Sequence, residues 1–181
     1  MSLNCVVTPL AYSFELLAAR MGQDGTRFNG CRCYNRMMEV TTHSLDEFNA
    51  EAARFSRTLA PGQSATVVAL SGDLGAGKTT FVQRVAKEFG VEDRVLSPTF
   101  VIEKIYGCLQ GPYVRLVHID AYRLKGAHEL EVLGWKELAA DPTNLILIEW
   151  PENVAEAIPR NAMRVALVYL DENTREVTLP V

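Results

Sequence analysis

The chain has 181 residues, of which 48% are apolar, and this length and composition fit one domain with a single sizeable core. Its formal charge of −4 lacks the basic excess of proteins that hold a nucleic-acid backbone directly, so we expect any role with nucleic acid to be indirect. No apolar run reaches the roughly 18 residues of a membrane span. The N-terminus also lacks the basic segment followed by an apolar segment that marks a secretory signal. We therefore expect a cytoplasmic protein with no membrane partner.

The first part of the chain differs from the rest in its pattern. The segment "GQDGTRFNGCRCYN" contains glycine and asparagine but has neither a helical nor a strand period. We expect residues 1–38 to be an N-terminal extension that is poorly ordered or lies outside the core, and residues 39–181 to be the folded domain. The pair Met37-Met38 immediately precedes the first regular pattern, so the upstream part is either an extension or an over-long start.

A helix is predicted to begin near residue 44. Ser44 and Glu47 have the spacing of a capping box, and Pro61-Gly62 ends the segment. Apolar residues recur at helical spacing on one face: Leu45, Phe48, Ala52, Phe55 and Leu59. The next run, "ATVVALSG", is continuously apolar between turn residues, which is typical of a buried parallel strand.

The segment "GDLGAGKTT" follows this strand and matches the phosphate-binding pattern G-x-x-x-x-G-K-[ST]. Glycines let the backbone point N–H groups at a phosphate, and a side chain at Gly77 would block its approach. Lys78 would reach the β- and γ-phosphates, and the Thr79 hydroxyl would ligate Mg²⁺. An apolar-faced helix follows, as the motif requires. The candidate phosphate-binding residues are Gly72, Asp73, Leu74, Gly75, Ala76, Gly77, Lys78, Thr79 and Thr80.

Two acidic residues stand at the ends of later strand patterns. The pattern "YVRLVHID" ends on Asp120, and the apolar run of "NLILIEWPE" ends on Glu149. One acid at such a position can hold Mg²⁺, directly or through water, and a second can orient or deprotonate the attacking water. The alternative for each is a structural carboxylate that caps a nearby turn. Their position after a phosphate-binding loop favours catalysis by Lys78, Asp120 and Glu149, and leaves open which acid takes which role.

Between the loop and these acids, "LSPTF" presents two hydroxyls, on Ser97 and Thr99. Pro98 excludes a continuing helix, so both lie on a loop. They would sense a γ-phosphate, as switch loops do, or merely form a turn that leads into a strand "FVIEKIYG". His118 is expected to be structural. Trp150 is either a core residue or an aromatic contact for a partner protein.

The remaining patterns predict a helical pair and a hairpin. The segment "AYRLKGAHELEVLGWKELAADP" has helical spacing and ends at a proline. The C-terminal segment "MRVALVYLDENTREVTLPV" predicts a β-hairpin that turns at 171–174, with Arg175 on the return strand.

Five motifs in this order and spacing resemble the bacterial TsaE family, formerly YjeE, of small ATPases in tRNA threonylcarbamoyladenosine synthesis: "GDLGAGKTTF", "SPTF", "HIDAYRL", "ELEVLGW" and "LIEWPE". The resemblance covers about residues 40–181. It implies the α/β class, as a single P-loop NTPase domain with a mostly parallel sheet flanked by helices and an antiparallel C-terminal edge hairpin. It also implies Mg²⁺-dependent ATP hydrolysis that is weak alone. The implied partners are TsaB and TsaD, which transfer a threonylcarbamoyl group to the adenosine beside the anticodon and would themselves handle the tRNA.

The resemblance also implies roles for individual residues. Glu149 matches the family's metal-associated glutamate, beside Thr79 as the Mg²⁺ ligand. Asp120 matches an essential aspartate, and Trp150 a functionally sensitive tryptophan. The residues expected to flank the base and ribose of ATP or ADP are Thr42, Ser44 and Arg175.

Two other functions fit a phosphate-binding loop of this kind. One is a small-molecule P-loop kinase, and the other is a nucleotide-gated binding module with little turnover. A kinase would usually carry an arginine-rich lid over the phosphates. No such lid is visible, because the arginines at positions 84, 94, 115 and 123 are scattered singly, which favours the ATPase.

Overall fold

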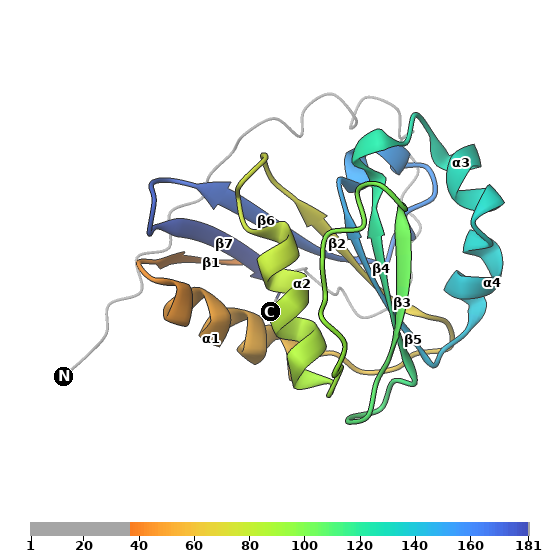
Figure 1. Ribbon diagram of the computed structural model, residues 1–181, viewed down its shortest axis with the longest axis horizontal. Coiled ribbons are helices and arrows are strands. Elements are labelled where there is room, and N and C mark those ends of the chain that lie inside the picture. Colours follow the sequence, from red (N-terminus) through yellow and green to blue (C-terminus); the bar gives the residue numbers. More distant parts are fainter. Residues whose placement is uncertain (1–36, 181) are drawn as a thin grey trace, which may run out of the picture. The chain divides into compact units, whose positions relative to one another are not determined.

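A seven-stranded mixed sheet is the centre of residues 37–180, the part of the chain that this computed structural model describes (Figure 1). Its strand order is β1-β7-β6-β2-β5-β4-β3. Strands β6, β2, β5 and β4 are mutually parallel, while β7, β1 and β3 pair antiparallel with their neighbours. The predicted α/β class with a mostly parallel sheet is confirmed. The strands are β1 (Met37–Thr42), β2 (Thr66–Ser71), β3 (Glu103–Gly107), β4 (Arg115–Asp120), β5 (Asn144–Glu149), β6 (Met163–Tyr169) and β7 (Arg175–Pro180).

The parallel strands end together at one edge of the sheet. Strands β2 and β5 are nearly or fully buried, as expected for continuous apolar runs with helices on both faces. The register pairs Leu70 of β2 with Glu149 of β5, and Glu149 with Asp120 of β4. Both acids therefore lie beside the loop that leaves β2, which is where open α/β sheets bind ligands.

Helices cover both faces of the sheet. Helices α1 (Leu45–Ser56) and α2 (Lys78–Glu88) contact each other and share one apolar cluster with the sheet (Figure 1). Helices α3 (Ala127–Val132) and α4 (Trp135–Ala140) contribute to a second cluster on the opposite face. Short 3-10 helices, η1 (Ala121–Arg123) and η2 (Pro151–Val154), follow β4 and β5. None of the helices within 37–180 is long and apolar enough to cross a membrane.

Helix α1 begins as the capping pattern predicts. The Ser44 hydroxyl accepts a hydrogen bond from the Glu47 backbone N–H at 3.2 Å. The Glu47 carboxylate accepts from the N–H of His43, one residue earlier than in the standard capping box. Phe48 is buried as predicted, whereas Leu45 is 62% exposed and faces a cavity at the start of the helix.

Three boundaries differ from the predicted ones. Helix α1 ends at Ser56, before the predicted end at Pro61-Gly62, so Leu59 lies beyond the helix although it is buried. Strand β3 begins only at Glu103, because the preceding residues form a turn in which Val101 N–H donates to the Pro98 carbonyl. Strand β1 begins at Met37, before the expected boundary at residue 39; the rest of the predicted extension lies outside the described residues. The hairpin of β6 and β7 is present, with its turn at 171–174, but β1 pairs along β7 and forms the outer edge beyond it.

Candidate nucleotide-binding site

The loop between β2 and α2 has a backbone that only glycine accepts easily. Gly72, Gly75 and Gly77 all have positive φ values, of 144°, 83° and 103°. A Cβ atom on Gly72 would lie 2.3 Å from the Leu167 carbonyl oxygen. A Cβ atom on Gly77 would lie 3.2 Å from the ring of Phe48. The neighbouring strand and helix therefore require the glycines that the sequence motif supplies.

Helix α2 offers its N-terminus to an anion. The helix begins at Lys78, and its N-cap, Gly77, provides no side-chain cap. The first N–H groups of a helix lack partners within the helix and, together with the helix dipole, favour a phosphate. The loop and this helix end thus fit a phosphate group by their own geometry.

Two adjoining cavities meet at this loop. We call the larger one, of about 430 Å³, the phosphate-loop cavity. We call the smaller one, of about 260 Å³, the hairpin cavity. Both are lined in part by Gly75, Gly77 and Thr80. The other lining residues of the phosphate-loop cavity are Leu74, Lys78, Thr79, Ser97, Thr99, Asp120, Tyr122, Glu149 and Trp150.

Lys78 is buried in the loop that carries it. Its Nζ atom donates to the carbonyl oxygens of Gly72 at 2.7 Å and Asp73 at 2.9 Å. The same atom lies 3.8 Å from the centre of the Trp150 ring. Burial lowers the pKa of Lys78, and the nearby carboxylates, Glu149 first, oppose that shift.

Glu149 joins the loop to the sheet. Its Oε1 atom accepts a hydrogen bond from the Thr79 hydroxyl at 2.9 Å, and the Nε2 atom of His118 lies 2.8 Å from the same oxygen. His118 is fully buried, yet it contacts the site, so treating it as merely structural missed this contact. Strand alternation was the available signal, because residues 118 and 120 of one strand point to the same face.

Asp120 gathers the hydroxyls of the "SPTF" segment. Its Oδ2 atom accepts from Ser97 at 3.0 Å and from Thr99 at 2.5 Å. Its Oδ1 atom accepts from the Tyr122 backbone N–H at 3.0 Å and so caps η1. Asp120 thus has both the capping contact and the cavity position that the sequence presented as alternatives. The hydroxyls of Ser97 and Thr99 lie at the cavity wall and hold the orientation of the Asp120 carboxylate.

Trp150 lies between the core and the cavity. It has a left-handed backbone, with φ of 58°, and its ring stands 5.1 Å from the ring of Tyr122. It is half-buried, packs against the second apolar cluster and lines the phosphate-loop cavity. Its ring therefore forms part of the cavity wall that faces Lys78.

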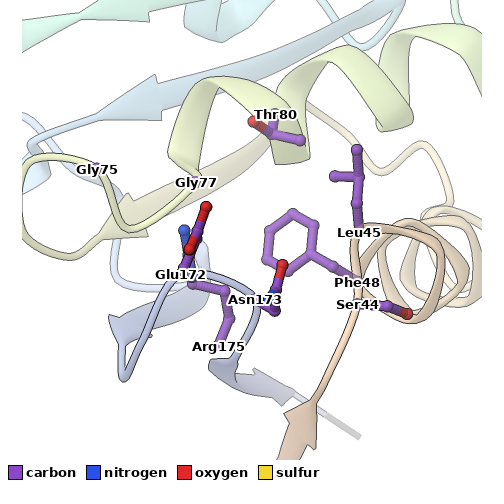
Figure 2. Close-up of a pocket in the computed structure, with 9 residues that line it drawn as sticks. All are labelled: Ser44, Leu45, Phe48, Gly75, Gly77, Thr80, Glu172, Asn173 and Arg175. Atoms are coloured by element: carbon purple, nitrogen blue, oxygen red, sulfur yellow. The ribbon is translucent and has the colours of Figure 1, made fainter.

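The hairpin cavity is built from three parts of the chain: the start of α1, the phosphate-binding loop with the first turn of α2, and the β6–β7 turn (Figure 2). Phe48 and its neighbours come from the start of α1, while Arg175 comes from the β6–β7 turn region. Arg175 donates to the carbonyl oxygens of Asp171 and Thr174, and its guanidinium lies 4.4 Å from the Tyr169 ring centre. Besides the three shared residues, the lining residues are Ser44, Leu45, Phe48, Glu172, Asn173 and Arg175.

Thr42 does not line this cavity, unlike Ser44 and Arg175. It is buried, and its hydroxyl donates to the Arg175 carbonyl at 3.2 Å, so it supports the strand that carries Arg175. Sequence reasoning did not find Leu45, Phe48, Glu172 or Asn173, because no local motif marks them.

The described residues contain no group of three or more His, Cys, Asp or Glu side chains able to hold a metal ion by themselves. A Mg²⁺ ion often takes only one or two protein ligands and completes its shell with water and substrate phosphates. The Thr79 hydroxyl and Glu149, joined by a hydrogen bond at the cavity wall, fit that pattern.

The family model and the curated relatives that match this chain name one family. The family model described as "Threonylcarbamoyl adenosine biosynthesis protein TsaE" matches residues 42–177. A relative named tRNA threonylcarbamoyladenosine biosynthesis protein TsaE, from Rickettsia prowazekii, is 38% identical over 136 residues, which cover 75% of this chain and 89% of the relative. A protein of the same name from Streptomyces coelicolor is 41% identical over 103 residues, 56% of this chain and 67% of the relative. The crystal structure of YdiB from Bacillus aligns with a TM-score of 0.63 and 28% identity, covering 80% of this chain and 84% of that one.

Proposed function

The chain belongs to the TsaE family, and from this premise we propose that it is a Mg²⁺-dependent ATPase required for threonylcarbamoyladenosine formation on tRNA. One observation carries the proposal. A phosphate-binding loop, a buried lysine, a hydroxyl paired with a carboxylate, and a second carboxylate all face one cavity. This set supports hydrolysis, because phosphoryl transfer is catalysed by groups of these kinds gathered around one phosphate site.

The loop binds and orients the phosphates. The N–H groups at the start of α2 donate to phosphate oxygens, and Lys78 exchanges its loop carbonyl partners for them. Mg²⁺ held by Thr79 and associated with Glu149 would neutralise charge that develops on the phosphates. Thr79 can serve both, because a hydroxyl has one hydrogen to donate to Glu149 and lone pairs for a metal.

Asp120 orients the attacking water. Its Oδ2 atom is held by Ser97 and Thr99, so the carboxylate keeps a fixed direction at the cavity wall. A fixed carboxylate within reach of a water can align it and accept its proton. In this proposal Lys78, Asp120 and Glu149 are the catalytic residues, and the hairpin cavity takes the base and ribose.

The surface around the phosphate-loop cavity supports a protein partner. Leu74 and Tyr122, which line the cavity, are 83% and 53% exposed, and Phe100, on the segment that bears Thr99, is 84% exposed. Exposed apolar side chains gathered around a site mark interaction surfaces. We propose that TsaD and TsaB bind here in the cytoplasm and that tRNA is contacted only through them, in keeping with the net charge of −4.

Phosphate release measured with and without purified TsaB and TsaD tests this function. We expect slow ATP turnover by the chain alone and faster turnover with both partners. Phosphate transfer to a metabolite without partners would instead indicate a kinase. A flat, low rate under every condition would indicate a nucleotide-gated binding module.

Trp150→Ala in the same assay tests the partner surface. Trp150 is half-buried and lines the cavity. We therefore expect its loss to lower partner-stimulated turnover strongly, while the free energy of unfolding falls only slightly. Trp150→Phe, which keeps a ring, is the matched variant. A large loss of stability with normal stimulation would assign Trp150 to the core.

A further inference from the structure

His118 is a buried polar residue among the apolar residues at the centre of β4. It has no exposed surface, and its neighbours on β4, Leu116, Val117 and Ile119, are equally buried. Its Nδ1 atom has no hydrogen-bond partner among the described residues. A leucine would fill this position without leaving a buried polar atom unpaired, so packing alone does not favour a histidine here.

The other ring nitrogen contacts the candidate metal site. The Nε2 atom lies 2.8 Å from Oε1 of Glu149, and the Thr79 hydroxyl donates to the same oxygen at 2.9 Å. Because a carboxylate only accepts hydrogen bonds, Nε2 carries the hydrogen of this pair. Glu149 is therefore held on one oxygen from two sides, while no hydrogen bond from the described residues reaches its Oε2 atom.

Sheet geometry makes this contact rigid. His118 and Glu149 lie on the adjacent parallel strands β4 and β5, and the register places His118 opposite Leu147, one pleat before Glu149. Leu116 and Leu147, which share their face of the sheet, belong to the cluster beneath α1 and α2. The imidazole thus supports the Glu149 carboxylate from inside the core, and the Thr79 hydroxyl contacts the same carboxylate oxygen.

We propose that His118 is a positioning residue that orients Glu149 for Mg²⁺, an inference that rests on the proposed function. Its hydrogen bond fixes one carboxylate oxygen and leaves the other to face a metal ion or its water. Residues that hold a metal-associated group in this way commonly change metal affinity about 10- to 100-fold when they are replaced.

The test separates metal binding from nucleotide binding. We titrate the full chain with the ATP analogue adenylyl imidodiphosphate in a calorimeter at several Mg²⁺ concentrations. The series gives the Mg²⁺ concentration at which half of the Mg²⁺-dependent gain in analogue affinity is reached. We expect His118→Leu to raise that concentration about tenfold while binding without Mg²⁺ stays within about twofold of wild type. His118→Gln, whose amide can still donate to Glu149, should restore most of the wild-type Mg²⁺ dependence. Leu116→Val, on the same strand face, is the control for altered packing.

Three outcomes would overturn the proposal. If His118→Leu has the Mg²⁺ dependence of wild type, or weakens binding equally with and without Mg²⁺, the residue has only a structural role. If His118→Gln is as impaired as His118→Leu while both stay folded, the hydrogen bond is not the cause. If wild type itself shows no Mg²⁺ effect, the proposed metal site fails together with this inference. Should His118→Leu not fold, His118→Asn, whose amide is too short to reach Glu149, replaces it.

Discussion

The two cavities that meet at the phosphate-binding loop are built in different ways. In the phosphate-loop cavity, Lys78, Asp120 and Glu149 are almost completely buried, and hydrogen bonds hold each of them. The hairpin cavity is lined by the exposed turn residues Glu172 and Asn173 and by the first residues of α1. One cavity has buried, oriented charges, whereas the other combines two exposed turn residues with the buried ring of Phe48 and the half-buried Arg175.

This difference agrees with the separate roles that we propose for the two cavities, catalysis in one and binding of the base and ribose in the other. Buried charges on parallel strands are costly and stay in place only when partners satisfy them, which suits chemistry that needs fixed groups. Side chains at a turn can adjust to a ligand, which suits binding of a base and ribose. We therefore expect substitutions in the phosphate-loop cavity to change stability or turnover strongly, and substitutions in the hairpin cavity to change affinity modestly.

The largest effect should come from Gly72→Ala. The added methyl group would meet the Leu167 carbonyl at 2.3 Å and require a left-handed backbone. We expect the free energy of unfolding to fall by about 3 to 5 kcal/mol, as measured by urea denaturation. Gly75→Ala is the matched control: it also has positive φ, but nothing lies within 4 Å of its Cβ position, so about 1 kcal/mol is expected. Equal losses at both positions would contradict the close contact at Gly72.

Thr79→Ala should lower ATP turnover about 100-fold, as loss of one group that stabilises the transition state commonly does. It removes the hydroxyl that is paired with Glu149 and proposed to ligate Mg²⁺. Nucleotide affinity without Mg²⁺, measured by calorimetry, should change little. Thr79→Ser keeps the hydroxyl and should retain most activity. Unchanged turnover in Thr79→Ala would remove Thr79 from the metal site.

The double variant Ser97→Ala, Thr99→Val should lower turnover by about tenfold, because Asp120, which we propose aligns the attacking water, would be less well oriented. Both hydroxyls donate to Asp120 Oδ2, so both must be removed. Thr143→Val removes a similar hydroxyl–carboxylate contact, to Asp141, outside either cavity. Steady-state kinetics should place the loss in kcat. A loss confined to KM would point to nucleotide contact instead.

The smallest effect is expected in the hairpin cavity, from Arg175→Ala. We expect ATP affinity to weaken about fivefold, or roughly 1 kcal/mol, with kcat at saturation unchanged. Arg175 lines the cavity and holds the turn through the Asp171 and Thr174 carbonyls. Arg164→Ala, on the exposed surface of β6, should have no effect. A large loss of kcat in Arg175→Ala would show that this cavity also takes part in chemistry.

Several parts of the fold were predictable because their signals are local. The buried strands were visible as apolar runs, and α1 was marked by the Ser44 and Glu47 capping pattern. The start of β3 was not, because Phe100 and Val101 are apolar and β-prone yet occupy a turn. The position of β1 outside the hairpin was not predictable either, since strand pairing between distant segments leaves no local pattern.

The sequence by itself determined the phosphate-binding loop. Nine consecutive residues specify its backbone, because glycine spacing and the following helix act locally. It also placed Asp120 and Glu149 at strand ends, since each apolar run stops at the acid.

Only the tertiary structure decided which residues meet. The contact of His118 with Glu149 depends on β4 lying beside β5 in one register, and the contact of Thr99 with Asp120 joins two segments 21 residues apart. The hairpin cavity joins residues 44–48 to residues 172–175. Such contacts follow from strand order and packing of the whole core, which no short segment encodes.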